Sequence, residues 1–130
     1  MREIKFRGMG INGEWYYGNL SIIKQRIKSM GIDPGFYISN KAGIPFAYRV
    51  RPETVGQYTG AKKFFEGDVI DCNGLAGLIV WNKKTHTWGV RLKIGDHIRT
   101  DRLCDWDEEA TVIGTKYENP KLLEASHAIE

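Results

Sequence analysis

The sequence predicts a mainly β protein: a small, partly open SH3-like barrel, or barrels, built from hairpins, with one or two short helices. Glycine supplies 15 of the 130 residues, two Asn-Gly pairs each precede a strand-forming run, and short alternating segments recur at hairpin spacing in the second half. We expect a single compact domain over residues 1–130, with a frayed tail at 125–130. Two β sub-units, at about 1–60 and 61–124, are the alternative.

The first predicted element is a hairpin over residues 2–20. Asn12-Gly13 separates a short alternating segment from an aromatic-rich run that begins at Trp15. A type I′ turn needs positive φ at both central positions, and Asn-Gly is the pair that best tolerates this. Aromatic residues favour strands, so the run after the turn is the return strand.

The segment 21–31 predicts the one helix of the first half. Ser21 can cap its start and Gly31 can end it. Apolar residues recur at helical spacing on one face: Ile23, Ile27 and Met30. So short a helix needs a sheet to dock on. An irregular excursion between strands is the alternative.

Three further strands complete the first half. Residues 36–39 and 46–51 read as strands around a polar turn at 40–43, and Pro45 suggests that the second begins beside a sheet edge. Residues 53–60 mix β-branched and aromatic residues with glycines, which predicts a bent or bulged strand.

The second half predicts a three-stranded meander over 68–72, 75–81 and 87–92, with Asn73-Gly74 as its first turn. Such a meander leaves two open edges. The polar stretch 95–109 is predicted to be a solvated acidic loop.

The chain is then expected to close with a strand and a short helix. Residues 110–117 form the predicted closing strand. The helix would begin at Pro120 with Asn119 as its cap, and its two leucines, Leu122 and Leu123, would face inward.

Composition narrows the possible functions. The net charge of +3 is mild and the basic residues are scattered, which is unlike a dedicated nucleic-acid binder. No window is apolar enough to span a membrane and no apolar signal core follows the start, so we expect a cytoplasmic protein. Cys72 and Cys104 should stay reduced there, as small buried apolar residues.

The sequence contains no recognisable catalytic or cofactor motif. His86, His97 and His127 stand alone, while a metal site needs three or four donors. The acidic residues at 101–109 lack EF-hand spacing. We therefore expect a protein that is not an enzyme and that has no metal or other cofactor.

Aromatic residues near basic ones are the remaining candidates for binding. Exposed aromatic rings beside cations can stack bases or contact a partner, although many should instead fill a small barrel core. The predicted surface surrounds the second hairpin turn of the second half: Trp81, Lys83, Lys84, Trp88 and Arg91.

Three blocks of the sequence stand out together. The first comprises MREIKFR at 1–7 and GEWYYG at 13–18; the second comprises PETVGQYTG at 52–60 and EGDVI at 66–70; the third is VIGTKYENPKLL at 112–123. In their order and spacing they resemble the YopX family of phage and prophage proteins. The resemblance covers roughly residues 1–124. It implies a phage or prophage origin, a mostly β, barrel-like fold and an unassigned function, with no catalytic residues to transfer.

Two departures from the family pattern carry structural expectations. Only residues 61–65 join the TG and EGD blocks, so this loop should be tight, with Phe64 or Phe65 packed under it. Lys116 stands where an apolar residue is more usual, which suggests a more exposed edge.

The favoured function is a phage accessory module that binds a macromolecule without catalysis. A host or phage protein is favoured over nucleic acid as its partner, and no membrane is expected. The alternative is a self-assembling homo-oligomer that uses strand edges or the Ile23, Ile27 and Met30 face. A nucleic-acid-binding protein and an enzyme are less favoured.

Overall fold

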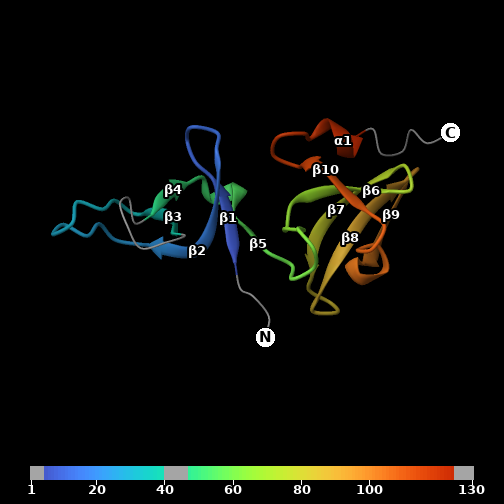
Figure 1. The fold of residues 1–130 in the computed structure, drawn as a ribbon, viewed down its shortest axis with the longest axis horizontal. Helices are drawn as coiled ribbons and strands as arrows, with labels where there is room; N and C mark the ends of the chain where they lie inside the picture. The colour runs from blue at the N-terminus through green and yellow to red at the C-terminus, as the bar shows by residue number, and fades with distance from the viewer. Residues whose placement is uncertain (1–4, 40–46, 125–130) are drawn as a thin grey trace. The chain divides into compact units, whose positions relative to one another are not determined.

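The computed structural model describes residues 5–39 and 47–124. The chain divides into two compact units, Met1–Tyr58 and Thr59–Glu130. Each contains one antiparallel five-stranded sheet, so the mainly β prediction is confirmed (Figure 1). Neither sheet closes into a barrel. In the described ranges no helix is long and apolar enough to cross a membrane.

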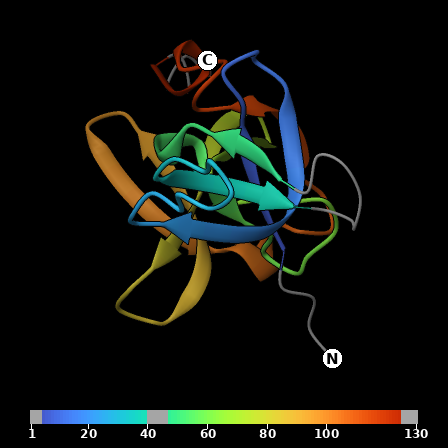
Figure 2. The same cartoon turned by 90° about the vertical axis from the view of Figure 1, so that its left-hand side faces the viewer.

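The first unit has the strand order β4-β3-β2-β1-β5. Its strands are β1 (Phe6–Met9), β2 (Trp15–Ile23), β3 (Gly35–Ser39), β4 (Tyr48–Val50) and β5 (Gly56–Gln57). Figure 2 shows β2, β3 and β4 side by side, as their hydrogen-bonded register requires. The end of β4 also meets the end of β1 through the single bridge Gly10↔Val50, which curls the sheet without closing it.

The first predicted hairpin is present, but its turn is not type I′. The Gly10 amide donates to the Glu14 carbonyl (2.9 Å), which leaves a three-residue loop. Only Gly13 has positive φ there (+84°). The reason is the Asn12 side chain, which accepts a bond from the Glu14 amide (3.1 Å) and donates one to the Tyr16 hydroxyl (2.9 Å).

The prediction of a helix over 21–31 is wrong. The first residues of this segment instead extend strand β2 as far as Ile23, because Ile22 pairs with Phe36 on β3. The chain then forms a small turn closed by the bridge Ile27↔Ile32. Cross-strand pairing of β-branched residues outweighs the helical spacing of the apolar side chains. The alternative prediction, an irregular excursion between strands, fits the rest of the segment.

The two strands predicted at 36–39 and 46–51 appear as β3 and β4, while Pro45 and the turn 40–43 lie outside the described residues. The bent strand predicted over 53–60 is mostly absent. Its place is taken by a 3₁₀ turn over Pro52–Thr54 and the two-residue strand β5. Pro52 starts that turn because its ring fixes φ near the helical value.

The second unit has the strand order β10-β6-β7-β8-β9. Its elements are β6 (Asp68–Cys72), β7 (Leu75–Asn82), β8 (Thr87–Ile94), β9 (His97–Arg102), β10 (Thr111–Thr115) and the helix α1 (Lys121–Glu124). The predicted meander is confirmed in β6, β7 and β8, and the closing strand in β10. Asn73 and Gly74 both have positive φ (55° and 94°), so this turn is type I′.

Strand β9 lies inside the stretch predicted to be a loop. Gly95, with φ of 59°, and Asp96 form the two-residue link between paired Ile94 and His97. The acidic residues beyond β9 begin with a 3₁₀ turn over Leu103–Asp105. A Gly-Asp pair between two strand-forming runs is itself a hairpin signal.

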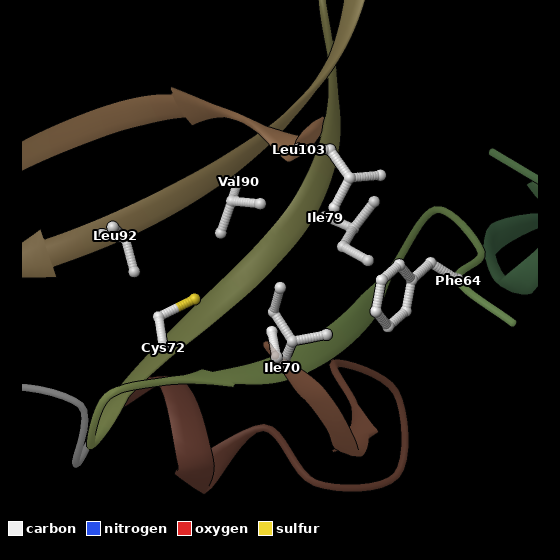
Figure 3. Packing of buried hydrophobic residues seen from close by; sticks show 8 residues of the cluster. Phe64, Ile70, Cys72, Ile79, Val90, Leu92 and Leu103 are labelled. Carbon is white, nitrogen blue, oxygen red and sulfur yellow. The ribbon is translucent and has the colours of Figure 1, made fainter. Parts of the chain in front are cut away.

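The core of the second unit lies on one face of its sheet. Buried side chains from β6, β7 and β8 converge there with those of the flanking turns (Figure 3): Phe64, Ile70, Cys72, Ile79, Val90, Leu92, Leu103 and Ala110. Both phenylalanines of the short connector, Phe64 and Phe65, are buried, as its length predicted.

Helix α1 contacts the other face of this sheet. Leu122 and Leu123 pack against Val69, Ala76 and Leu78, which confirms the inward leucines. Asn119 acts differently from the prediction. Its carbonyl accepts from the Leu122 amide (3.1 Å), while its side chain accepts from the Thr115 amide (3.3 Å).

Candidate functional site

The predicted binding residues lie on and beside the β7–β8 hairpin. Trp81 and Trp88 are directly paired, with ring centroids 5.1 Å apart at 74°. Trp81 is 40% exposed, while Trp88 is half-buried against the core. Lys83 and Lys84 are exposed in the turn between these strands.

Arg91 points to the opposite face of the sheet. It pairs with Leu78, and neighbouring residues on a strand alternate between faces. Trp88 and Val90 therefore lie on the core face, and Arg91 lies on the face that α1 contacts. The structure brings the two tryptophans together but separates them from Arg91.

Beside Arg91 lies an open hollow of about 350 Å³. Its lining comes from β7, β8, β9 and α1: Ala76, Leu78, Arg91, Lys93, Ile98 and Leu123. Leu78 pairs with Arg91, and Lys93 pairs with Ile98, so two cross-strand rows form the site. Helix α1 contacts β7, and the β8–β9 side of the hollow stays exposed, with Ile98 68% accessible.

The hollow combines an apolar floor with a cationic wall. Ala76 and Leu78 are buried at its base, while Arg91 and Lys93 are exposed. Within the ranges described, neither cation has an ion pair or a hydrogen-bond partner. Such a lining favours a ligand that carries an apolar group next to an anionic one.

Two acidic residues at the end of β9 and just beyond it are already engaged. Asp101 accepts from Arg99 (2.8 Å) and from the Trp106 indole (2.9 Å), and Asp105 pairs with Arg102 (3.2 Å). In the part of the chain that the structure describes, no three His, Cys, Asp or Glu residues group as metal ligands. These acids instead hold the chain after β9 in place.

The two cysteines differ, which corrects the expectation that both are buried. Cys104 is exposed. Cys72 is 1% exposed, and its burial, with smaller contributions from the charges of Asp71 and Asp101, raises the pKa of its thiol to about 11. A neutral buried thiol behaves as a small apolar side chain.

Of the six residues that line the hollow, only Arg91 was predicted from the sequence as a binding residue. The alternation Arg91-Leu92-Lys93 already places two cations on the face opposite the buried Leu92. That signal alone could have paired Lys93 with Arg91. Ile98 could not be added, because its strand was read as a loop.

The three blocks that resemble the YopX family contain residues that serve the fold. In the second block, Thr54 accepts a bond from the Met9 amide (2.8 Å), and Thr59 donates to the Phe64 carbonyl (2.9 Å). Both threonines are buried. Each one satisfies backbone groups at a turn.

The EGD and KYENP segments meet in the second unit. Gly67 has φ of +92°, and an added Cβ would lie 3.0 Å from the Tyr117 ring. The Lys116 amide donates to the Gly67 carbonyl (3.0 Å), and the Glu118 amide donates to the Thr115 hydroxyl (3.1 Å). Lys116 is exposed, as its departure from the usual pattern suggested.

Residues of these blocks therefore stabilise turns of the fold. The order of the blocks along the chain is what a family model can recognise. A family model described as YopX protein matches residues 5–124. The chain belongs to the YopX family. No curated protein matches it. The hollow thus lies within the extent of the YopX match, while most of its lining lies outside the three blocks.

Proposed function

We propose that this YopX-family chain is a phage- or prophage-encoded module of the bacterial cytoplasm that binds another protein without catalysis. The hollow on the second unit is the binding site. One observation supports this most: two exposed cations, without partners in the described ranges, border an apolar floor. A protein segment that pairs an apolar side chain with carboxylates complements such a surface.

The same geometry weighs against nucleic acid. Base stacking needs aromatic rings beside cations that contact phosphate. Here the Trp81–Trp88 pair lies on the core face, and Arg91 and Lys93 lie on the other. The residues that line the hollow are aliphatic or cationic, with no aromatic ring among them, and the net charge of the chain is only +3.

The chemistry of the lining also favours binding over catalysis. Acid–base or nucleophilic catalysis needs a group such as an imidazole, carboxylate, thiol or hydroxyl at the reacting atoms. The lining residues carry aliphatic side chains, a guanidinium and an ammonium. A recognition role uses all of these groups.

The test is capture of proteins from infected host extract with two matched charge-reversal variants. Arg91→Glu with Lys93→Glu should lose the captured partner, because carboxylates would then repel its acidic segment. Lys83→Glu with Lys84→Glu changes the net charge equally at the β7–β8 turn and should retain it. Equal loss in both variants would contradict the hollow as the site, and retention in both would do so as well. Tight binding of DNA or RNA at low salt would favour the nucleic-acid reading.

Self-assembly is the second candidate function. Val112 and Ile113 are 42% and 45% exposed on β10, an edge strand of the second sheet. The face of Ile23, Ile27 and Met30 no longer supports it, because these residues do not form a helix. Light scattering at high concentration tests it, and a monomer would exclude it.

A further inference from the structure

We infer that the partner is an acidic, extended peptide segment that adds to β9 as a sixth strand of the second sheet. It would place an apolar side chain against Ile98 in the hollow and a carboxylate near Arg91 and Lys93. This inference rests on the proposed function and specifies the partner's chemistry and its mode of binding.

The two edges of this sheet differ in their readiness to accept a strand. β10 has five residues, and its register with β6 shifts between Val112 and Gly114. Such a bulge disturbs pairing and is a common protection of edges. β9 has six residues in regular register with β8, and five of them are exposed. β9 is therefore the better template.

Strand addition to β9 would extend the rows of the hollow. Ile98 pairs with Lys93, and Thr100 pairs with Arg91, so both residues of β9 lie on the face of the hollow. An added strand lies about 5 Å from β9 and about 10 Å from β8. Long side chains on β8 can span the second distance, so alternate residues of the peptide would meet Arg91 and Lys93.

The opposite face of β9 offers little discrimination. Arg99 and Asp101 already pair with each other there, and Asp101 also holds Trp106. Specificity should therefore come from two peptide positions on the hollow face. One is an apolar residue beside Ile98, which is 68% exposed. The other, two residues away, is acidic.

A second copy of this chain is a poor occupant of β9. Its own β9 would bring Arg99 and Arg102 to a surface that is already cationic. Its β10 has no acidic residue at all. Charge complementarity therefore selects a different chain that carries carboxylates.

The experiment is an NMR titration of the labelled full chain with a synthetic eight-residue peptide. The peptide alternates isoleucine or glutamate on one face with threonine on the other. Shifts should concentrate in β8 and β9. Arg91→Glu with Lys93→Glu should weaken binding at least tenfold, and so should replacement of the peptide's glutamates by lysine. Lys83→Glu with Lys84→Glu should leave affinity within about twofold.

Backbone methylation tests strand addition directly. An edge strand uses only alternate peptide amides for pairing. Of two peptides N-methylated at odd or at even positions, one should lose binding and the other should retain it. Equal binding by both would overturn strand addition while leaving the hollow as the site. Unchanged binding by the Arg91 and Lys93 variant would overturn both proposals. No shift at millimolar peptide would overturn this inference alone, since the capture experiment tests the hollow separately.

Discussion

The two units contain similar sheets but are stabilised differently. In the described part of the first unit, the buried apolar side chains are few: Met9, Ile38 and Val50. Arg7 is buried there as well and lies 4.5 Å from the Trp15 ring centroid. The second unit buries a continuous apolar cluster on one sheet face and a smaller one under α1. The first therefore depends more on aromatic, cation–π and side-chain-to-backbone contacts.

This difference bears on where a binding site can exist. A sheet whose stability comes from one face can leave part of its other face uncovered. The second unit does so, since the hollow lies opposite the main core. The core packed on the opposite face of the sheet fixes strand β8 in place. It therefore keeps Arg91 and Lys93 at fixed positions, which a recognition surface requires.

The largest expected effect comes from truncating one fully buried isoleucine in each unit, Ile79 in the second and Ile38 in the first. Ile79→Ala should cost about 2–5 kcal/mol, because Ile79 is fully buried and its cavity cannot collapse. Ile38→Ala should cost less, near the low end of that range, because Ile38 has half-exposed neighbours such as Tyr48 that can move in. Hydrogen exchange measures each unit separately. Equal losses would contradict the contrast between the cores.

A smaller effect is expected from adding a methyl group to one glycine in each unit. At Gly77 a new Cβ would lie 2.4 Å from Val90 and 3.1 Å from the Cys72 sulfur. At Gly8 it would lie 2.7 Å from Val50. Each alanine variant should lower the free energy of unfolding by about 1–3 kcal/mol. The facing valine is β-branched and has few rotamers, so it cannot easily move aside.

Gly95→Ala is unsuitable as a control because of its positive φ, so Gly89→Ala, with its nearest contact at 3.0 Å, is the milder comparison. Gly77→Ala and Gly8→Ala should destabilise their units by similar amounts, because each of these two glycines faces a buried valine. Chemical denaturation measures the loss. A neutral Gly77→Ala would show that the larger core is loosely packed.

The sequence allowed the strands to be predicted where pairing is local. The hairpin at Asn73-Gly74 follows directly from residues that tolerate positive φ. The segment 21–31 was misread because Ile23, Ile27 and Met30 recur at helical spacing, while Ile22 and Ile23 in fact belong to strand β2. Their partners on β3 decide between the two, and these lie over ten residues away.

The candidate site was only partly predictable for a similar reason. Residues near one turn were grouped by their proximity in sequence, yet alternation along β8 sends Trp88 and Arg91 to opposite faces. The hollow joins residues from Ala76 to Leu123. Such an assembly depends on the order of the strands, and β9 was not recognised as a strand.

The two Asn-Gly turns offer a finer comparison. Asn73→Ala should cost about 1–2 kcal/mol, because Asn73 has φ of 55° and alanine resists that conformation. Asn12→Ala should cost below about 1 kcal/mol, through loss of two exposed hydrogen bonds. Glycine separates the mechanisms: Asn73→Gly should restore stability, while Asn12→Gly should not. Thermal denaturation measures all four variants, and rescue at both positions would contradict the different turn types.

The last prediction concerns the pH dependence of stability, and it expects no effect near pH 7. Both cysteines of the chain belong to the second unit, and burial raises the pKa of Cys72 to about 11. An unfolded thiol ionises near about 8.5, so between pH 9 and 11 the unfolded chain releases a proton that the folded chain retains. The stability of the second unit should therefore fall across this window and be unaffected by this thiol below it.

Cys72→Ala isolates this effect because it keeps Cys104 and every lysine and tyrosine. Urea denaturation from pH 8 to 11 should give curves that converge as the wild type loses its advantage over the variant. Alkylation provides an independent measurement: Cys104 should react in the folded chain, while Cys72, 1% exposed, should react only on unfolding. Parallel pH curves together with rapid modification of both thiols would show that the core around Cys72 opens readily. The contrast between the well-packed second unit and the sparse first unit would then be lost.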